Sequence, residues 1–364
     1  MSRTTGARPG NPRRLPETEA VLEVRRAVRG WLADYATGAT SDVAVALSGG
    51  ADSLALTAAA VVEAGQVDAL VVDHQLQRGS DKVAAEAAAA ALALGCRSAH
   101  VLAVDVGADG GMEAAARVAR YTALYGARGG LPVLLGHTLD DQAETVLLGL
   151  GRGSGGRSIQ GMAAFADPWG RPLLSVRRAV TRQLCADIGL TPFEDPHNSA
   201  AKFTRVRLRN EVLPLLEEVL GGGVAEALAR TAEQLRDDGA VLDALADELL
   251  RAASGPVSNG PTLAIETLAT APAALRRRAI RAWLLAGGAK ALTNKHFQAV
   301  DELITAWRGQ GGVAVGGGAP GRRLVVARER GRLTLRLQGS QGNIMDGRGD
   351  TRGASDGPEG GSEA

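Results

Sequence analysis

Apolar and polar positions follow two alternating rhythms along the first half of the chain. Short, nearly continuous apolar runs are typical of strands buried on both faces, and longer stretches with helical periodicity separate them. We expect strands at 43–46, 67–73, 98–104 and 131–137, and helices starting at 54 and covering 81–94, 113–127 and 139–150. Strands that alternate with helices predict an α/β fold, a parallel sheet with helices on both faces.

The pattern changes beyond about residue 215. Three glycines at 221–223 interrupt the chain, and helical periodicity then predicts helices at 225–253, 273–286 and 294–307. Two apolar runs, at 323–328 and 332–337, flank a glycine and predict a hairpin. We therefore expect a smaller, mainly helical second domain with a hairpin. The predicted division is a disordered basic arm at 1–20, a larger domain at 21–214, the second domain at 215–338 and a disordered tail at 339–364.

Composition narrows the class of protein. The 364 residues are enough for two domains, and with 45% apolar but only 3% aromatic residues the cores must be built from Ala, Val and Leu. The net charge of +1 is uninformative, but nearly all cations are Arg. Arg suits phosphate and nucleic acid, although an Arg-rich genome explains the same bias.

Cysteine usage indicates a reducing compartment, and the apolar runs bear on membrane and export signals. Cys96 and Cys185 are far apart, which argues against a disulfide scaffold, a zinc site or an iron–sulfur site. The sequence shows neither a membrane-spanning run nor an apolar signal core. We expect a cytoplasmic protein with no membrane partner, and its oligomeric state stays open.

The densest signal lies between the first expected strand and the helix that follows it. This turn consists of Ser48, Gly49, Gly50, Ala51, Asp52 and Ser53. A small glycine-containing turn that leads into a helix N-terminus directs backbone N–H groups and the positive end of the helix dipole at one point, which suits phosphate. Asp52 is the first candidate ligand for Mg²⁺ at this site.

A second cluster, at 136–145, follows another strand end. Thr138 and Asp141 have the spacing of an acidic capping box, and Asp141 and Glu144 share a helix face. One interpretation is that acids in a first turn complement the helix dipole and have no further role. They also suit Mg²⁺ beside a phosphate loop or the ammonium group of a substrate. His137 precedes them at the strand end.

Cationic residues form two further candidates. Arg117 lies four residues before Tyr121 on an expected helix, where an exposed face and a phosphate-binding arginine are both consistent with the pattern. A basic segment around Phe203 carries Lys202, Arg205, Arg207 and Arg209 without an acid. A solvated helix start and a patch for RNA both fit that segment.

These motifs occur in one order over about residues 40–220, and the chain resembles the tRNA(Ile)-lysidine synthase family of PP-loop ATP pyrophosphatases. The motifs that carry the resemblance are Ser48–Ser53, Val72–His74, Glu113–Arg117 with Arg120–Tyr121, Gly136–Thr145, Arg152–Gly153, Gly161–Met162, Arg171–Leu174, Glu194–Asp195 with Asn198, Phe203, Arg205 and Leu213–Pro214. The resemblance implies a PP-loop ATP-binding catalytic domain at 21–214 and a tRNA- or substrate-binding domain at 215–338.

The resemblance also implies a reaction. ATP, with Mg²⁺, adenylates C2 of cytidine 34 in the CAU anticodon of tRNA(Ile) and releases pyrophosphate. Free L-lysine then displaces AMP to form lysidine, and the tRNA changes from methionine to isoleucine identity and decodes AUA. The enzyme is thus expected to be a ligase that forms a carbon–nitrogen bond.

Roles for individual residues follow from the resemblance and from residue chemistry. Ser48–Ser53 are expected to bind ATP, and Asp52 to bind Mg²⁺. The expected catalytic residues are Asp52, Arg117, His137, Asp141 and Glu144, with Asp141 and Glu144 also holding lysine. Lys202, Arg205, Arg207 and Arg209 are expected to contact the tRNA.

Two other functions stay open at this point. One is another PP-loop enzyme, such as a tRNA thiolase or an amidotransferase-type synthetase; the isolated cysteines argue against the first, and the lack of a visible glutaminase domain argues against the second. The other is a non-catalytic, nucleotide-dependent RNA-binding module. The joint presence of Asp52, Asp140, Asp141 and Glu144 argues against that module.

Overall fold

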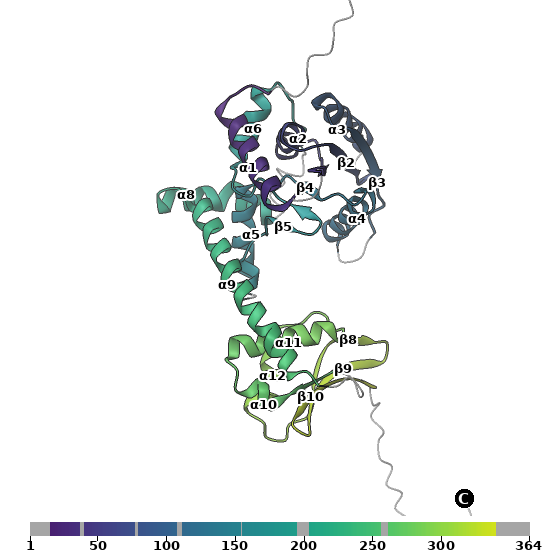
Figure 1. The fold of residues 1–364 in the computed structure, drawn as a ribbon, viewed down its shortest axis with the longest axis vertical. Helices are drawn as coiled ribbons and strands as arrows, with labels where there is room; N and C mark the ends of the chain where they lie inside the picture. Colours follow the sequence, from purple (N-terminus) through teal and green to yellow (C-terminus); the bar gives the residue numbers. More distant parts are fainter. Residues whose placement is uncertain are drawn as a thin grey trace, which may run out of the picture. The chain divides into compact units, whose positions relative to one another are not determined.

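The structure, a computed structural model, divides into two compact units, Met1–Gly239 and Ala240–Ala364 (Figure 1). It describes residues 15–36, 40–76, 79–107, 111–153, 155–194, 204–255 and 261–339. The division falls inside helix α9 (Val224–Ala253), whereas the sequence suggested a domain limit at 214/215. The functional domain limits stay a prediction. Most of the expected basic arm, nearly all of the expected tail, and Lys202 lie outside the described residues.

The first unit is built on a six-stranded sheet in the order β3-β2-β1-β4-β6-β5. Its strands are β1 (Val43–Ala46), β2 (Val67–Asp73), β3 (Ser98–Ala103), β4 (Val133–Leu135), β5 (Phe165–Ala166) and β6 (Trp169–Gly170). Neighbouring strands are parallel except for β5, which pairs antiparallel with β6. The predicted parallel sheet is confirmed, with an antiparallel edge that the sequence did not reveal.

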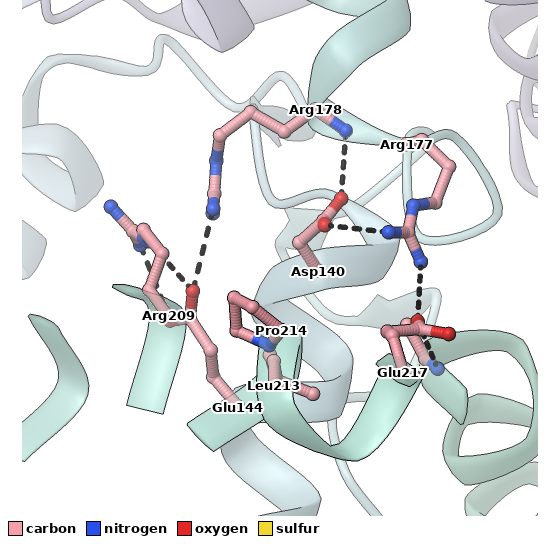
Figure 2. Close-up of a pocket in the computed structure, with 9 residues that line it drawn as sticks. Asp140, Glu144, Arg177, Arg178, Arg209, Leu213, Pro214 and Glu217 are labelled. Carbon is pink, nitrogen blue, oxygen red and sulfur yellow. Dashed lines mark hydrogen bonds and ion pairs between the residues drawn. The ribbon is translucent and has the colours of Figure 1, made fainter. Parts of the chain in front are cut away.

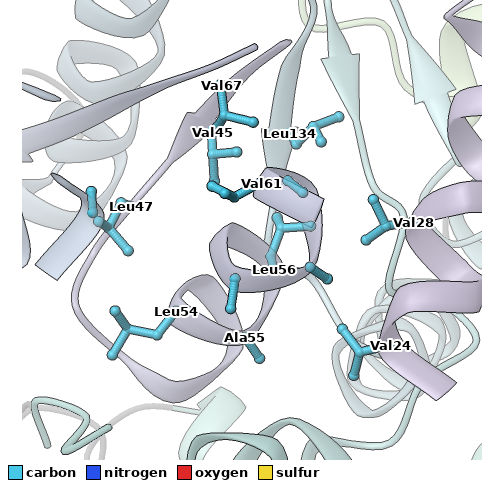
Figure 3. Packing of buried hydrophobic residues seen from close by; sticks show 14 of the residues in the cluster. Val24, Val28, Val45, Leu47, Leu54, Ala55, Leu56, Val61, Val67 and Leu134 are labelled. Carbon is cyan, nitrogen blue, oxygen red and sulfur yellow. The ribbon is translucent and has the colours of Figure 1, made fainter. Parts of the chain in front are cut away.

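Helices cover both faces of this sheet. They are α1 (Glu19–Tyr35), α2 (Ala51–Glu63), α3 (Ser80–Leu94), α4 (Met112–Ala127), α5 (Leu139–Arg152) and α6 (Arg178–Asp187). Alternate strand residues point to opposite faces, so Val45 and Leu134 pack with α1 and α2 (Figure 3), whereas Ala44 and Leu135 lie in a separate cluster with Leu124 of α4. The expected α/β architecture with helices on both faces is therefore confirmed.

The chain after α5 is irregular. A 3₁₀ turn, η1 (Gly156–Ile159), precedes β5, and beyond α6 come α7 (Thr204–Arg207), a π-helical turn η3 (Leu208–Val212) and α8 (Leu213–Leu220). Single π-turns of this kind are frequent at functional sites. The sequence analysis predicted neither α1 nor α6, and it placed no helix at 204–220.

The second unit combines helices with a four-stranded antiparallel sheet in the order β7-β10-β9-β8. Its elements are β7 (Thr262–Ala264), α10 (Ile265–Ala269), α11 (Ala273–Ala286), α12 (Asn294–Thr305), β8 (Val313–Ala319), β9 (Arg322–Glu329) and β10 (Arg332–Gly339). The predicted hairpin is confirmed as β9–β10, at the centre of this sheet. Strand β8 lies within the glycine-rich residues 311–321. Its Gly317 and Gly318 have φ of +107° and +108°, at an irregularity in the pairing with β9. None of the described helices is both long and apolar enough for a membrane span.

Candidate active site

Three polar segments follow adjacent strands at one edge of the first sheet. Ser48–Ser53 follows β1, Asp73–His74 follows β2, and His137–Asp141 follows β4. Since β2, β1 and β4 are parallel neighbours, their carboxyl ends meet at this edge. Ligands of open parallel sheets bind at such an edge. The topology therefore brings the predicted segments together.

The loop after β1 is shaped to receive an anion. Gly49 has φ of +81°, and Gly50 precedes α2 without a side chain to cap the helix. Ser53 Oγ donates to the Gly50 carbonyl oxygen (2.9 Å) and accepts from the Ser48 N–H (3.2 Å), which closes the turn. Uncapped N–H groups at a helix start suit phosphate. A Cβ on Gly136 would lie 3.0 Å from backbone atoms of Asp52 and Ser53, so a larger residue would push the end of β4 and this loop apart by a few tenths of an ångström.

Asp52, in the first turn of α2, faces the start of α6. Its Oδ1 accepts a short hydrogen bond from Thr181, and its Oδ2 lies 3.4 Å from Nε of Arg178. Burial raises the pKa of Asp52 above its ordinary value, and the contacts with Thr181 and Arg178 oppose that rise. The carboxylate thus depends on its polar partners to stay charged.

The acidic helix α5 begins with the capping box that the spacing predicted. Thr138 accepts from the Asp141 N–H (3.4 Å), and the Asp141 carboxylate accepts from the Thr138 N–H (2.8 Å) and hydroxyl (2.9 Å). Burial alone would raise the pKa of Asp141, but the charge of Arg178 and the bonds from Thr138 outweigh it and lower that pKa. Glu144, one turn on, has a fully buried side chain.

The side chain of Arg178 links the carboxylates of Asp52, Asp141 and Glu144. Its guanidinium lies 2.6 Å from Asp141 Oδ1 and 3.4 Å from Glu144 Oε1, in addition to its contact with Asp52. Its backbone N–H donates to Asp140 Oδ2 (2.7 Å), which fixes the start of α6 against α5 (Figure 2). One cation therefore contacts three carboxylates from two helices.

Two more arginines reach Glu144 from the segment 204–212. Arg209, on the π-helical turn, places Nε 2.8 Å from Glu144 Oε1, and Arg205 places Nε 3.8 Å from Glu144 Oε2. A small cavity of about 120 Å³ opens beside them (Figure 2). Its lining consists of Asp140, Glu144, Arg177, Arg178, Arg209, Leu213, Pro214, Glu217 and Ala225. The buried carboxylate of Glu144 therefore lies next to a cavity and is compensated by the arginines around it.

His137 and Arg117 belong to a second group, which is rich in cations. Arg117 lies over the ring of Tyr121 (4.9 Å to the centroid) and donates to its hydroxyl (3.4 Å). Burial lowers the pKa of His137 to about 4, and the charges of Arg171, Arg120 and Arg117 add to the shift while Asp141 opposes it. Nδ1 of His137 is buried without a hydrogen-bond partner among the described residues.

Comparison with known proteins identifies the family. Residues 23–216 match the PP-loop domain, and residues 263–334 match the TilS substrate binding domain. A tRNA(Ile)-lysidine synthase of Nocardia farcinica is 75% identical over 315 residues, which cover 86% of this chain and 98% of that protein. This chain belongs to the tRNA(Ile)-lysidine synthase family. Two further tRNA(Ile)-lysidine synthases are similar to it. The one from Rhodococcus erythropolis is 68% identical and covers 88% of this chain and 97% of the relative; the one from Mycobacterium tuberculosis is 60% identical and covers 81% and 90%. The family expected from the ordered motifs is confirmed.

Within this family member, Asp52 and the predicted site residues beyond the loop after β1 fall into two groups, apart from Arg207 and Lys202. Asp52, Asp141, Glu144, Arg205 and Arg209 lie in one connected set of contacts. Arg117 and His137 lie in the cationic group described above. Arg207 is exposed and pairs with Glu211 (2.8 Å), and Lys202 is outside the described residues.

Sequence reasoning missed Arg178 and Thr181. A weak signal existed, because Arg177 and Arg178 open an amphipathic stretch at 178–187. Cations at a helix start oppose the helix dipole, so their presence there indicates nearby acids. Nothing local identifies those acids, which lie 34 to 126 residues earlier in the chain.

Proposed function

We propose that this chain ligates lysine to cytidine 34 of the CAU-anticodon tRNA(Ile), through a C2-adenylated cytidine, with release of pyrophosphate and AMP. Membership of the tRNA(Ile)-lysidine synthase family supports the reaction class. The observation that carries the proposal is the meeting of Asp52, Asp141 and Glu144 beside an anion-binding helix start. Such a site is suited to hold a triphosphate and the lysine amine close together, as the two successive steps require.

The adenylation half is assigned to the loop after β1. Backbone N–H groups at the start of α2 and the hydroxyls of Ser48 and Ser53 are proposed to bind the β- and γ-phosphates of ATP. Asp52 fits Mg²⁺ only in part: it offers a single carboxylate, and the described residues contain no cluster of three metal-binding side chains. That is sufficient for Mg²⁺, which takes its other ligands from phosphate and water and neutralises the charge of the leaving group when bound.

The ligation half is assigned to α5. Asp141 and Glu144 are proposed to bind the lysine ammonium and orient its amine toward C2 of the adenylated cytidine. The ammonium first gives one proton to Asp141 or Glu144. The resulting amine forms the new carbon–nitrogen bond as the bond from C2 to the AMP oxygen breaks, AMP leaves as the anion, and the second amine proton passes to solvent. His137, held neutral by its low pKa, is proposed to lie near the adenylate, and Arg117 to neutralise phosphate charge.

The tRNA is proposed to contact Lys202, Arg205, Arg207 and Arg209, together with the second unit, which contains the match to the TilS substrate binding domain. The exposed guanidinium of Arg207 is the natural choice for a phosphate contact. A cytoplasmic location follows from the tRNA substrate.

A tRNA thiolase is not favoured. The chain has two cysteines, both buried, and burial raises the pKa of Cys96 to about 12 and that of Cys185 to about 11. Both thiols therefore stay protonated, and neither is suited to carry sulfur or ligate a cluster.

A pyrophosphate-release assay tests the proposal. We expect release that requires both ATP and a CAU-anticodon tRNA, and a loss of at least about a hundredfold in Asp52→Asn. Asp81→Asn is the matched control, because Asp81 is also the second residue of its helix, α3, and lies outside the site. Release without tRNA, or equal rates in the two variants, would contradict the assignment.

A further inference from the structure

Arg178 occupies the position that the proposed lysine ammonium requires. Its Nη2 lies 2.6 Å from Asp141 Oδ1 and its Nη1 lies 3.4 Å from Glu144 Oε1, and these are the two carboxylates proposed to bind lysine. Arg209 also contacts both acids, at 3.4 Å and 2.8 Å. Guanidinium groups thus neutralise the two carboxylates that are proposed to bind lysine.

A further cation cannot simply be added to this group. Asp141 and Glu144 are already matched by Arg178 and Arg209, and Arg205 also lies 3.8 Å from Glu144, so an ammonium that reaches either carboxylate also meets a guanidinium group. Like charges at such distances in a partly buried site repel each other strongly. Lysine therefore binds tightly only if one arginine leaves.

Of the two, Arg178 has an alternative partner close by. Its Nε lies 3.4 Å from Oδ2 of Asp52, which belongs to the first turn of α2, where the phosphates of ATP are proposed to bind. Among the described residues, the hydrogen-bond partners of Arg209 are Asp141 and Glu144, not Asp52 or the loop after β1. The backbone of Arg178 is held by Asp140, so its side chain can turn without moving α6.

The position of Arg178 on α6 also favours its movement. It is the first residue of that helix, where the positive end of the helix dipole disfavours a cation. The guanidinium is held there by the acids around it. A polyphosphate supplies more negative charge than any one carboxylate and takes a guanidinium in a bidentate contact.

We propose that Arg178 is a positioning residue that couples the two substrates: it takes the place of the lysine ammonium in the ligand-free protein and transfers to the nucleotide phosphates when ATP binds. Lysine then binds tightly only to the nucleotide-bound protein. This inference rests on the proposed function, because it takes Asp141 and Glu144 as the lysine site. It requires no contribution from the tRNA.

Equilibrium dialysis of radiolabelled lysine against the full chain tests the coupling. The nucleotide is an ATP analogue with a methylene group between the α- and β-phosphorus atoms, supplied with Mg²⁺, so that no adenylation occurs. In the wild type we expect the analogue to tighten lysine binding on the order of tenfold, a typical coupling between sites. In Arg178→Gln we expect lysine to bind without nucleotide about as tightly as to the nucleotide-bound wild type, with the coupling lost.

Two further variants separate coupling from a structural effect. Arg178→Lys retains a cation and is expected to restore part of the coupling. Arg182→Gln removes another charge of α6, which is exposed, pairs with Glu194 and contacts none of the three carboxylates, and is expected to keep the full coupling. Thermal unfolding of each variant identifies any that fails to fold.

The outcomes are distinct. Equal lysine affinity with and without the analogue in the wild type, or no lysine binding with the analogue present, overturns the coupling. Undiminished coupling in Arg178→Gln overturns the role of Arg178. Formation of lysidine by the wild type in a separate assay with tRNA shows that such a failure belongs to the coupling and not to the proposed function.

Discussion

His137 is expected to stay neutral far below the pH at which an exposed histidine becomes protonated. Burial, aided by three nearby arginines, lowers its pKa to about 4, whereas an imidazole in the unfolded chain titrates near 6.5. Between these two values the unfolded chain binds a proton at this position and the folded chain does not. Protonation therefore favours unfolding, and the contribution of His137 to stability is present above about pH 6.5 and is lost as the pH falls toward 4.

The size of this effect follows from the shift. A difference of about 2.5 pKa units corresponds to about 3 kcal/mol at pH 4 and below, and to about 2 kcal/mol at pH 5. His137→Gln removes this titration, so the free energy of unfolding of the variant should fall less between pH 7 and pH 5 than that of the wild type. Between pH 7 and pH 5, the free energy of unfolding of the wild type should decrease by about 2 kcal/mol more than that of the variant.

The direct assay is an NMR titration of the histidine Cε1–H resonances. The chain has only five histidines, and the signal of His137 is assigned by its disappearance in His137→Gln. His100→Gln, on the exposed surface of β3, controls for the substitution itself. A midpoint above pH 6 for His137, or unfolding free energies that change equally in the wild type and His137→Gln, would refute the reasoning.

Two further predictions concern stability. Gly149→Ala should destabilise the first unit by about 2 kcal/mol in urea unfolding, because its Cβ would lie 1.9 Å from a backbone carbonyl oxygen of η1. Gly151→Ala is the control in the same helix, because nothing lies within 4 Å of the added carbon; it should be neutral or stabilise by up to about 1 kcal/mol. Equal changes in stability in the two variants would contradict the packing of η1 on α5. Asp301→Asn should cost the second unit about 3 kcal/mol, since its carboxylate lies 2.6 Å from a buried arginine. Glu302→Gln, at the exposed neighbouring position, is the control, and hydrogen exchange in α11 and α12 measures both.

Much of the secondary structure of both units could be predicted because its signals are local. The strand Val67–Asp73 and the helix Ala273–Ala286 have the expected bounds, and the capping box at Thr138 and Asp141 is present. The strand expected at 131–137 is shorter, Val133–Leu135. Gly136 approaches the backbone of the loop after β1 there, and that contact lies outside any local pattern.

The polar network of the site could be predicted only in part. Residue type and spacing indicated Asp52, Asp141 and Glu144, because acids near a glycine turn at strand ends have few structural uses. The arginines that hold them were not predictable in their roles. Arg178 is 126 residues from Asp52, and sequence periodicity carries no information about such long-range pairs. The edge strands β5 and β8 were missed for a similar reason: one is two residues long and the other is rich in glycine.

The most direct test of the account is nucleoside mass analysis of a CAU-anticodon tRNA after incubation with the protein, ATP, Mg²⁺ and lysine. We expect the nucleoside at position 34 to gain the mass of lysine less one water, with ATP and lysine both required, and no gain with Asp52→Asn. Unmodified cytidine after incubation with the folded wild-type protein would contradict the central claim.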